Sequence, residues 1–482
     1  MWGRLCQGLI REFGVRYFST RGRAPAQDFA GVLLAGLAED GGLYVPEFWP
    51  RFSTAEIRGL RGLPYAELAA AVMAPFVDGA VADLAALCAD AYAGFAHPAV
   101  VPLQQLETGL FALELFHGPT LAFKDLAMQL LGRLFEQVLA GERLTIVGAT
   151  SGDTGAAAIE ALKGRRGIMI AILHPEGRVS EVQRRQMTTV AAANVGNIAI
   201  RGSFDDCQDL VKAMFADAKL RRELRLSAVN SINWARIAAQ IPYYFAAALA
   251  LGAPDRAVAF SVPTGNFGNV LAGWAAARMG LPVARLVVAC NRNDILARYL
   301  AANDMSLRPV EPSLSPSMDI QVSSNFERLL FELLDRNPAE TERIMLDFRA
   351  GGRMEVPEGA WRRMQGLFCG FALDDAGTEA EIGRLYRASG YLADPHSAIG
   401  IAGARARRAE RGVPMIAAAT AHPAKFAPTV ERASGVCPAL PARLADLYQR
   451  PERSVVVAND LAAVAAEVRA LAGRNVAEGT IV

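Results

Sequence analysis

Lysine is the residue that this sequence most nearly lacks. The chain has 482 residues and 50 lysines and arginines together, of which only Lys124, Lys163, Lys212, Lys219 and Lys425 are lysine. Arginine stays protonated in proteins and cannot form an imine, whereas a desolvated lysine can lose its proton and attack a carbonyl carbon. We interpret Lys163, Lys212 and Lys219 as surface residues because they lie in charged, helix-like stretches. Lys124 has apolar neighbours, so we expect it to be buried and to have a chemical role.

Cysteine and histidine are also sparse, and their spacing excludes two classes of site. The chain has 6 cysteines and 5 histidines, with no CxxC, HxxxH or HExxH pair. The cysteines are Cys6, Cys88, Cys207, Cys290, Cys369 and Cys437. We therefore predict no metal site and no disulfide framework. Reduced cysteines fit a cytoplasmic protein, which is the location that we expect.

The chain lacks an excess of charge and a long hydrophobic run. Its formal net charge is +1 and no basic tract is interleaved with aromatic residues, so we expect no nucleic-acid partner. The longest uncharged apolar stretch near a helix, 241–254, is shorter than the roughly 20 residues that cross a bilayer, so we expect no membrane association. The first residues carry arginines, but Glu12 and weak amphipathicity favour a short tail or upstream start over a transit peptide.

Length and composition predict a globular protein with more than one core. A chain of 482 residues that is 52% apolar exceeds a single hydrophobic core. Residues 54–94 have a helical pattern interrupted at Pro64 and Pro75, and strands and helices alternate after residue 143. The predicted strands are 143–147, 168–173, 197–200, 257–262, 284–289 and 414–418. Such alternation favours parallel sheets with helices on both faces, the α/β class.

We divide the chain into four predicted segments. Residues 1–22 form an N-terminal tail and 23–97 a helical domain without chemistry. Residues 98–225 form a smaller, nested α/β domain, and 226–482 form a larger α/β domain with C-terminal helices. We expect the functional site to lie between the two α/β domains.

The stretch 116–125 places Lys124 where a turn meets a helix. Its sequence is Phe-His-Gly-Pro-Thr-Leu-Ala-Phe-Lys-Asp, in which Gly118 and Pro119 indicate a turn. A helical apolar pattern then begins at Leu126. Asp125 falls in the first turn, where a carboxylate suits the helix dipole.

Two turns rich in small and polar residues follow predicted strands. Residues 148–155 are Gly-Ala-Thr-Ser-Gly-Asp-Thr-Gly, and residues 263–269 are Pro-Thr-Gly-Asn-Phe-Gly-Asn. Open α/β sheets bind ligands at the carboxyl ends of their strands, and the N–H groups of a helix start suit a carboxylate or phosphate. Neither turn is a P-loop and no GxGxxG occurs, which counts against a nucleotide site. Taken alone, the second turn is as consistent with a structural tight turn as with a phosphate cup.

Further polar segments stand beside apolar elements. Residues 420–426, Thr-Ala-His-Pro-Ala-Lys-Phe, follow the last predicted strand and include Lys425. Residues 229–236, Val-Asn-Ser-Ile-Asn-Trp-Ala-Arg, precede an apolar helix, and so many amides beside a core helix indicate buried partners, structural or ligand. The stretch 307–324 is rich in proline and serine and predicts a loop that lines a site.

A lysine able to form an imine, a phosphate cup and an anion-binding turn together suggest pyridoxal 5′-phosphate. With these features the sequence resembles the threonine synthases, which are pyridoxal-phosphate enzymes of fold type II. The matching segments are 117–125, 150–156, 229–240, 262–269, 323–328, 394–400 and 420–426. This resemblance implies an α/β fold like that of tryptophan synthase β, with two open, mostly parallel sheets flanked by helices and an N-terminal helical domain. Asp394 and the N-terminal extension depart from the pattern that we expect.

The same resemblance assigns roles to individual residues. Lys124 would hold the cofactor through an imine and act as the catalytic base, and Thr420 would face the pyridine nitrogen. The cofactor phosphate would be bound by Gly265, Asn266, Phe267 and Asn269. Residues near the substrate carboxylate and the cofactor 3′ oxygen would be Ser151, Asp153 and Thr154. Weaker candidates for the substrate phosphate are Asn230, Ser231, Asn233, Arg236 and Lys425.

By this analogy the protein would convert O-phospho-L-homoserine and water to L-threonine and phosphate, the last step of threonine biosynthesis. The route would be γ-elimination of phosphate followed by addition of water at the β carbon. A phospholyase or dehydratase on the same fold is the alternative within this class. A cofactor-free ligand-binding paralogue would need a lost lysine or a degraded cup, and a nucleotide-dependent enzyme would need a nucleotide motif. We expect a monomer or homodimer.

Overall fold

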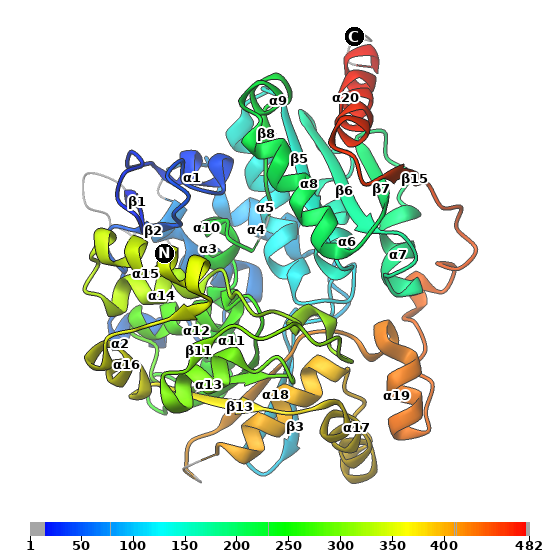
Figure 1. Cartoon of the computed structure of the whole chain (residues 1–482). Helices are drawn as coiled ribbons and strands as arrows, with labels where there is room; N and C mark the ends of the chain where they lie inside the picture. The colour runs from blue at the N-terminus through cyan, green and yellow to red at the C-terminus, as the bar shows by residue number, and fades with distance from the viewer. Residues whose placement is uncertain (1–14, 78, 230, 409, 411, 479–482) are drawn as a thin grey trace.

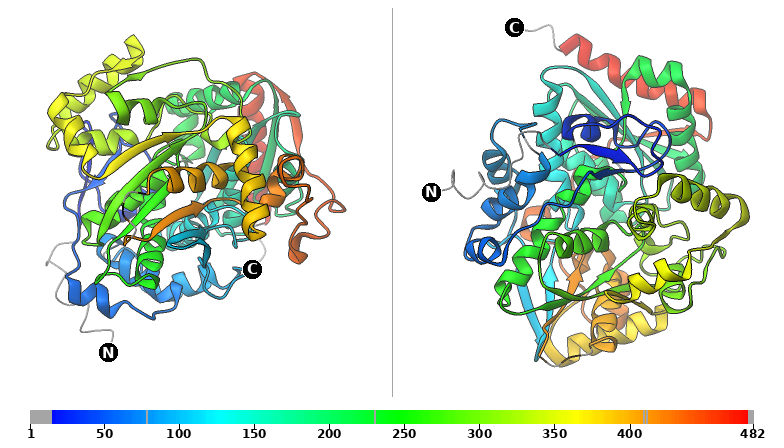
Figure 2. Two further views of the ribbon diagram at one scale, coloured as in Figure 1. Left: turned by 90° about the horizontal axis from the view of Figure 1, so that it is seen from below. Right: turned by 90° about the vertical axis from the view of Figure 1, so that its left-hand side faces the viewer.

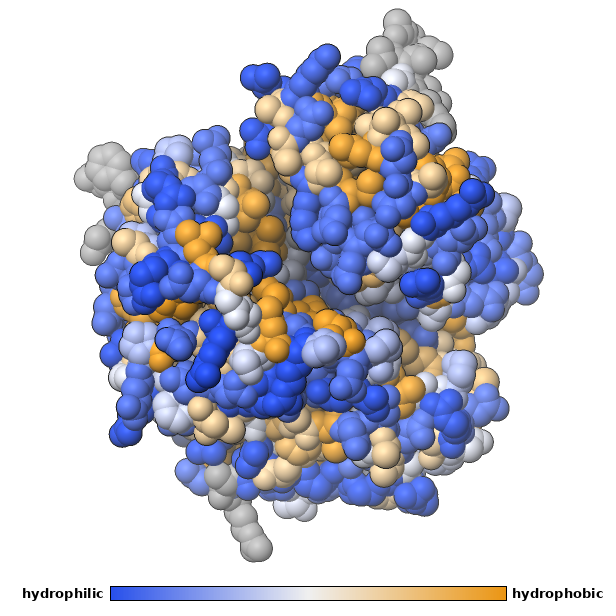
Figure 3. All heavy atoms as spheres, viewed as in Figure 1, coloured by the Kyte–Doolittle hydropathy of each residue, from blue (hydrophilic) through white to orange (hydrophobic). Residues whose placement is uncertain are grey.

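The computed structural model describes residues 15–77, 79–229, 231–408, 410 and 412–478. Figure 1 shows a smaller sheet in the upper half of the molecule and a larger sheet in the lower half, and Figure 2 shows the same arrangement from two further sides. The space-filling surface is hollowed between these two parts (Figure 3). Residues 1–14, for which we expect a tail or upstream start, and Asn230, a candidate for the substrate phosphate, are not among the described residues. None of the described helices combines the length and hydropathy that crossing a membrane requires.

The N-terminal part combines helices with a small antiparallel sheet. Strand β1 (Tyr17–Ser19) pairs with β2 (Tyr44–Pro46). The helices are α1 (Phe29–Ala35), α2 (Thr54–Gly59), α3 (Tyr65–Val77) and α4 (Leu84–Tyr92). These elements carry buried apolar side chains that join the main core of the molecule.

Two details of this part differ from the prediction. The tail expected over residues 1–22 is packed from residue 15 on, because Tyr17 is buried and its hydroxyl donates to Phe76 O at 2.7 Å. The interruption expected at Pro75 is absent, and α3 runs through this proline. Pro75 lies in the last turn, where burial of Phe76 and Val77 offsets one lost backbone hydrogen bond.

The larger sheet has 6 strands in the order β13-β10-β9-β14-β4-β3. They are β13 (Phe368–Ala372), β10 (Val283–Cys290), β9 (Val258–Pro263), β14 (Met415–Ala419), β4 (Leu110–Glu114) and β3 (Leu103–Glu107). Neighbouring strands are parallel except β3 with β4. Strands β9 and β14 are buried along their whole length, as expected for central strands covered on both faces. Helix α18 (Pro395–Ala406) packs against β14, and α12 (Gly268–Arg278) packs against β10.

The smaller sheet has 5 strands in the order β15-β7-β6-β5-β8, all parallel. They are β15 (Val455–Ala458), β7 (Val195–Arg201), β6 (Ile168–Pro175), β5 (Leu144–Ala149) and β8 (Leu226–Ser227). The surrounding helices are α5 (Lys124–Leu139), α6 (Asp153–Leu162), α7 (Glu181–Thr188), α8 (Phe204–Ala216), α9 (Ala218–Leu224) and α20 (Leu461–Glu478). Helix α5 packs against α6, and α8 and α20 pack against β6.

The remaining elements surround the larger sheet and the junction between the sheets. The helices are α10 (Trp234–Ala238), α11 (Ile241–Ala250), α13 (Ile295–Ala302), α14 (Phe326–Leu333), α15 (Pro338–Gly351), α16 (Glu358–Gln365), α17 (Asp375–Ser389) and α19 (Ala427–Ser434). Strand β11 (Met305–Ser306) pairs with β12 (Arg353–Met354). The short 3-10 helices are η2 (Pro316–Met318), η3 (Pro423–Phe426) and η4 (Ala442–Leu444).

The chain passes between the two sheets at places that the predicted boundaries miss. Strands β3 and β4 belong to the larger sheet, so a boundary at residue 98 does not separate the sheets. Strand β15 and helix α20 return to the smaller sheet, so 226–482 is not a single unit. The predicted architecture of two mostly parallel sheets flanked by helices is confirmed.

Candidate active site

Three neighbouring parallel strands of the larger sheet end at the same edge. Strands β9, β14 and β4 lie side by side and run in the same direction. The segments that follow them, 264–267, 420–426 and 115–123, therefore leave the sheet together, where open α/β sheets bind their ligands. Each of these segments contains or adjoins a predicted site residue.

The segment that ends at Lys124 is joined to the segment after β14 by backbone hydrogen bonds. Phe123 N donates to Thr420 O at 2.8 Å, and His422 N donates to Leu121 O at 3.0 Å. Leu121 has a φ of 65°, so the chain turns sharply just before the lysine. Helix α5 then begins at Lys124, as predicted.

Asp153 holds two buried lysines where the two sheets meet. Lys124 Nζ lies 3.0 Å from Asp153 Oδ2, and Lys425 Nζ lies 2.6 Å from Asp153 Oδ1. The exposed fractions of the side chains are 8% for Lys124, 0% for Lys425 and 4% for Asp153, so water screens these ion pairs little. Both lysines follow strands of the larger sheet, whereas Asp153 begins α6 after β5 of the smaller sheet. The cluster therefore links the carboxyl edges of both sheets.

Burial and charge oppose each other in this cluster. Burial lowers the pKa of Lys124 below its usual range, although Asp153 favours the ammonium form. Burial alone would raise the pKa of Asp153, but Lys124 and Lys425 outweigh this effect and hold that pKa well below its ordinary value. Asp153 therefore stays ionised, and Lys124 gives up its proton more readily than a surface lysine does.

Sequence reading missed the polar groups that surround the cluster. Gln183 Nε2 donates to Asp153 Oδ1 at 2.7 Å. Thr120 O accepts from Lys425 Nζ at 2.8 Å and from Gln186 Nε2 at 3.1 Å. Gln183 and Gln186 lie on one face of α7, and their spacing of three residues is too common a pattern to identify them in advance.

Asp125 lies in the first turn of α5 as predicted, but its contacts are with the preceding turn. Its Oδ1 accepts from Thr120 Oγ1 at 2.6 Å and its Oδ2 from Thr120 N at 2.8 Å. Burial raises the pKa of this carboxyl group to about 6. A Cβ on Gly118 would stand 2.4 Å from Asp125 Cβ, so the turn requires glycine there. The aspartate thus fixes the backbone immediately before Lys124.

Asn269, in the first turn of α12, presents an unsatisfied donor. Its Oδ1 accepts from the hydroxyl of Tyr243 at 2.6 Å and from that of Tyr244 at 2.7 Å. These bonds fix the orientation of the amide. Its Nδ2 is buried and has no hydrogen-bond partner among the described residues. A buried donor at the start of a helix is well placed for an anionic acceptor such as phosphate.

The turn before α12 is packed closely against the backbone of η2 and requires glycine at position 265. A Cβ on Gly265 would lie 2.8 Å from Ser317 O and 3.2 Å from Met318 Cα. Ser323 Oγ donates to Gly265 O at 2.7 Å. The loop 307–324, which the sequence predicts to line a site, thus lies against this turn.

The other predicted members of the turn contribute in different ways. Phe267 has a φ of 64°, and its ring is buried. The centroids of the Phe267 and Phe326 rings lie 5.6 Å apart, so only the backbone of Phe267 can face a ligand. Asn266 Oδ1 accepts from Ser324 Oγ at 3.3 Å. The amide of Asn266 is thus held by the same loop that covers Gly265.

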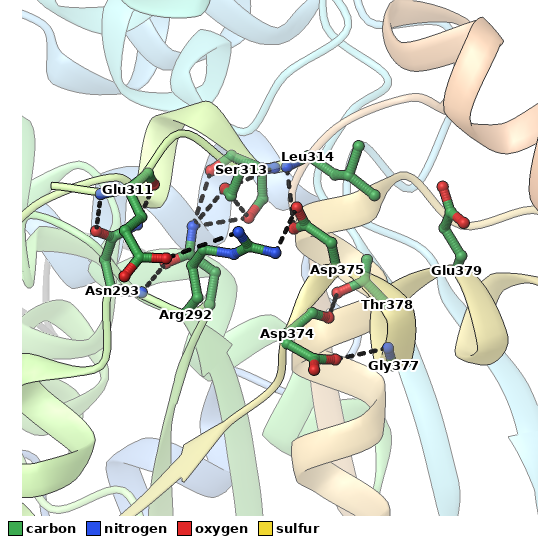
Figure 4. Close-up of polar contacts among 12 residues, drawn as sticks. Arg292, Asn293, Glu311, Ser313, Leu314, Asp374, Asp375, Gly377, Thr378 and Glu379 are labelled. Carbon is green, nitrogen blue, oxygen red and sulfur yellow. Dashed lines mark hydrogen bonds and ion pairs between the residues drawn. The ribbon is translucent and has the colours of Figure 1, made fainter.

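The far side of this loop is fastened to α17 and to the segment after β10 (Figure 4). Arg292 Nη2 lies 3.0 Å from Asp375 Oδ2, and Leu314 N donates to Asp375 Oδ1 at 3.2 Å. Asn293 Nδ2 donates to Glu311 O at 2.8 Å, and Glu311 N donates back to Asn293 Oδ1 at 2.9 Å. These contacts hold the loop in one place against the turn before α12.

The contacts of Asn233 do not support its predicted role in binding the substrate phosphate. Its Oδ1 accepts from Ala235 N at 3.1 Å and caps α10, and its Nδ2 donates to Leu33 O at 2.9 Å. Both ends of the amide therefore serve the backbone. Ser231 is half-buried, and Asn325 Nδ2 donates to both Ser231 O and Asn266 O at 3.0 Å, which joins this segment to the cup.

Arg236 is a buried cation with little compensation. Its side chain donates from Nη1 to Val229 O at 3.2 Å, and no carboxylate of the described residues pairs with it. Burial lowers its pKa to about 10. Its charge reaches Lys124, whose pKa it lowers further. A buried arginine in this state favours a bound anion.

The turn between β5 and α6 is held by Thr150. Its Oγ1 accepts from Gly152 N at 3.0 Å and from Gly155 N at 2.9 Å. Gly152 has a φ of 139°, which only glycine adopts readily. Ser151 and Thr154 are half-buried at this helix start, where backbone N–H groups suit a carboxylate.

No group of histidine, cysteine, aspartate and glutamate in the described part of the chain could hold a metal ion. The site offers amines, amides and backbone N–H groups instead. These groups bind anions and carbonyl compounds rather than cations.

Comparison with known proteins decides the family. The family described as "Threonine synthase N terminus" matches residues 16–92, and "Threonine synthase, C-terminal" matches residues 397–468. The family described as "Pyridoxal-phosphate dependent enzyme" matches residues 97–346. Threonine synthase of Pseudomonas aeruginosa is 57% identical over 459 residues, which cover 94% of this chain and 98% of that protein. The chain belongs to the threonine synthase family.

Solved threonine synthase structures share the fold over nearly the whole chain. The pyridoxal-phosphate-bound enzyme of Brucella melitensis has a TM-score of 0.93 at 52% identity, covering 95% of this chain and 100% of that one. The yeast threonine synthase has a TM-score of 0.89 at 37% identity, covering 96% of this chain and 99% of that one. Membership of the family, predicted from the motifs around Lys124, is confirmed.

Proposed function

We propose that this protein catalyses the threonine synthase reaction, in which O-phospho-L-homoserine and water give L-threonine and phosphate. The proposal rests on family membership and on one structural observation, the buried pair of Lys124 and Asp153 where the two sheets meet. The reaction breaks the bond from the γ carbon to the phosphate oxygen and adds the hydroxyl of water at the β carbon. The β carbon loses one hydrogen and the γ carbon gains one, while the other hydrogen of water leaves with the phosphate. The reaction forms L-threonine, as the last step of its biosynthesis.

The residues present fit pyridoxal 5′-phosphate as cofactor. The buried Nδ2 of Asn269, which has no partner among the described residues, suits a phosphate group. Gly265, Asn266 and the backbone of Phe267 would complete the phosphate cup. When bound, this cofactor withdraws electrons from the carbons of an amino-acid substrate. By the resemblance to the family, Thr420 would face the ring nitrogen with a neutral hydroxyl.

Lys124 is the catalytic residue of this proposal. Burial lowers the pKa of its amine, which favours the neutral form needed to link covalently to an aldehyde. When not linked to the cofactor, the Lys124 amine would remove and return protons at the substrate carbons. Asp153, 3.0 Å away, limits the directions in which Nζ can turn.

The anionic groups of the substrate have candidate partners among the predicted residues. Ser151 and Thr154, at the start of α6, suit the substrate carboxylate. Arg236, with Ser231, suits the substrate phosphate, because Arg236 is a buried cation without a carboxylate partner in the described residues.

The contacts of Lys425 favour a different role from the one first expected. Its Nζ is engaged by Asp153 and by Thr120 O. We assign it to fixing Asp153, and thereby Lys124, rather than to binding the substrate phosphate.

The test is an assay of the purified protein with pyridoxal phosphate and O-phospho-L-homoserine. We expect phosphate and threonine to appear in equal amounts. Release of phosphate together with a keto acid in place of threonine would assign the protein to a phospholyase or dehydratase instead.

The buried, unlinked thiols of Cys88, Cys207 and Cys290 support a reducing compartment, and we infer that the protein acts in the cytoplasm.

A further inference from the structure

A buried carboxylate at the start of α18 is connected through two neighbouring side chains to two sides of the candidate cofactor site. Asp394 is fully buried and caps the start of α18. Its Oδ1 accepts from His396 N at 3.0 Å and from His396 Nδ1 at 2.8 Å. Its Oδ2 accepts from Ser397 N at 3.2 Å and also from Ser397 Oγ. The side chains of His396 and Ser397 are therefore bound to different oxygens of this carboxylate, and two paths of hydrogen bonds start from it.

The first branch reaches Thr420. Thr420 N donates to Ser397 Oγ at 2.9 Å, so the hydroxyl hydrogen of Ser397 must point to Asp394. Thr420 O in turn accepts from Phe123 N, the residue before Lys124, at 2.8 Å. Both backbone groups of Thr420 are thus fixed, which sets where its side chain lies relative to the lysine.

The second branch reaches the phosphate cup. His396 Nε2 accepts from Ser317 N at 3.3 Å. Because this nitrogen accepts, the ring hydrogen lies on Nδ1 and points to Asp394. The carbonyl oxygen of Ser317 is the atom that a Cβ on Gly265 would meet at 2.8 Å. His396 therefore holds η2 against the turn that carries Gly265 and Asn266.

Capping a helix does not by itself require a buried charge. Serine, threonine or asparagine satisfies the first N–H groups equally well, and a buried carboxylate costs free energy unless its oxygens are fully hydrogen-bonded. The only ion-pairing partner of Asp394 in the described residues is His396, which is neutral in the form that accepts from Ser317. The Asp394 carboxylate accepts four hydrogen bonds. Two come from backbone N–H groups at the start of α18, and the other two orient the side chains of His396 and Ser397, which a smaller capping residue could not do.

We propose that Asp394 is a positioning residue that sets both ends of the cofactor site at once, Thr420 through Ser397 and the phosphate cup through His396 and Ser317. The proposal rests on the proposed function, since it assumes that pyridoxal phosphate occupies this site. It assigns the two branches to different parts of the cofactor, so their effects are separable. The Ser397 branch acts on the ring, and the His396 branch acts on the phosphate.

The test is titration of cofactor-stripped protein with pyridoxal 5′-phosphate and with pyridoxal, which lacks the phosphate. His396→Phe keeps an aromatic ring against Phe426 but removes the contact to Ser317. We expect it to weaken pyridoxal-phosphate binding about tenfold, the effect of one good hydrogen bond, and to leave pyridoxal binding nearly unchanged. Ser397→Ala should change both affinities in parallel and shift the absorption band of the bound cofactor, and Ser397→Thr should restore that band.

Asp394→Asn should show both effects, and Asp374→Asn is its matched control. Asp374 caps α17 by accepting from Gly377 N at 2.8 Å (Figure 4) and is exposed. This control should change neither the affinities nor the band. If Asp394→Asn alters only stability, or if His396→Phe weakens both ligands equally, the positioning role is wrong. If Asp394→Asn does not fold, His396→Phe and Ser397→Ala decide the matter alone. Wild-type protein that binds no pyridoxal phosphate would instead refute the proposed function itself, and this inference with it.

Discussion

At the scale of single residues, the site concentrates positive charge in a place from which water is excluded. Lys124 and Lys425 share the single carboxylate of Asp153, and Arg236 adds a further buried cation. Buried charge without compensation is costly, so this arrangement favours anionic ligands. A cofactor and a substrate that each carry a phosphate would supply the missing negative charge.

Removing the amine of Lys124 should abolish catalysis and leave the fold intact. We expect Lys124→Ala and Lys124→Arg to lower turnover of O-phospho-L-homoserine by about 10³-fold or more, because neither side chain can form the covalent link or accept a proton. Thermal melting of the cofactor-free variants should match wild type closely. Lys212→Ala is the control, since Lys212 pairs with Asp209 on the surface. Appreciable threonine formation by either Lys124 variant would contradict the assignment.

Removing the charge of Asp153 should destabilise the protein far more than removing a surface carboxylate. Asp153→Asn leaves two buried lysines without a counter-ion, and we expect a loss of about 3–5 kcal/mol in the free energy of unfolding at neutral pH. Asp209→Asn, which breaks the exposed pair with Lys212, should cause no measurable change. Chemical denaturation of the cofactor-free proteins measures both. Equal, small effects would mean that the cluster is not held as a buried ion network.

Ionisation of the buried Asp125 carboxyl group should lower the free energy of unfolding as the pH rises. Burial raises its pKa in the folded state to about 6, above the roughly 3.9 of an unfolded chain. Between these values the folded state binds more protons than the unfolded state, so this contribution is fully present below about pH 4 and is lost as the pH passes 6. The stability difference between wild type and Asp125→Asn should therefore shrink from pH 4 to pH 7. A difference that stays constant over this range would contradict the raised pKa.

At the scale of elements, the turn between β9 and α12 depends on the loop that covers it. Gly265→Ala would bring a Cβ to 2.8 Å from Ser317 O and 3.2 Å from Met318 Cα. Since the loop is fastened elsewhere, we expect the turn to move, with pyridoxal-phosphate binding weakened about tenfold or more. Gly359→Ala, where a Cβ meets nothing within 4 Å, is the control and should bind normally. Unchanged affinity in a titration of Gly265→Ala would exclude this turn as the phosphate cup.

Much of the site follows from local sequence because its turns adjoin strongly patterned elements. The positions of Lys124, Asp153 and the 263–269 turn at strand ends or helix starts were all predictable. What could not be predicted are contacts between distant segments. The engagement of Lys425 by Asp153 and of Asn233 by Leu33 O depends on how the segments fold against each other, and no local pattern encodes it.

At the scale of the whole molecule, the two sheets exchange segments of chain. The sequence predicts the long buried strands well because their apolar runs are unambiguous. It does not predict β15, a short and mostly exposed edge strand, or assign β3 and β4 to the larger sheet. Sheet membership depends on pairing between residues far apart in the chain, and a short strand carries too little pattern to reveal its partner.

The exchange of segments places the site where the sheets meet. Asp153 follows β5 of the smaller sheet, whereas Lys124 and Lys425 follow strands β4 and β14 of the larger sheet. A change in the spacing of the sheets would separate Lys425, which follows β14, from Asp153. The reactivity of Lys124 is therefore a property of the assembled molecule.

The most direct test of this account is to find which of the five lysines holds the cofactor. Protein loaded with pyridoxal phosphate is reduced with borohydride, digested and mapped by mass spectrometry, with Lys124→Ala treated in parallel. We expect a single stoichiometric label on Lys124 and none in the variant. A stoichiometric label on Lys425 or any other lysine, or none at all, would contradict it.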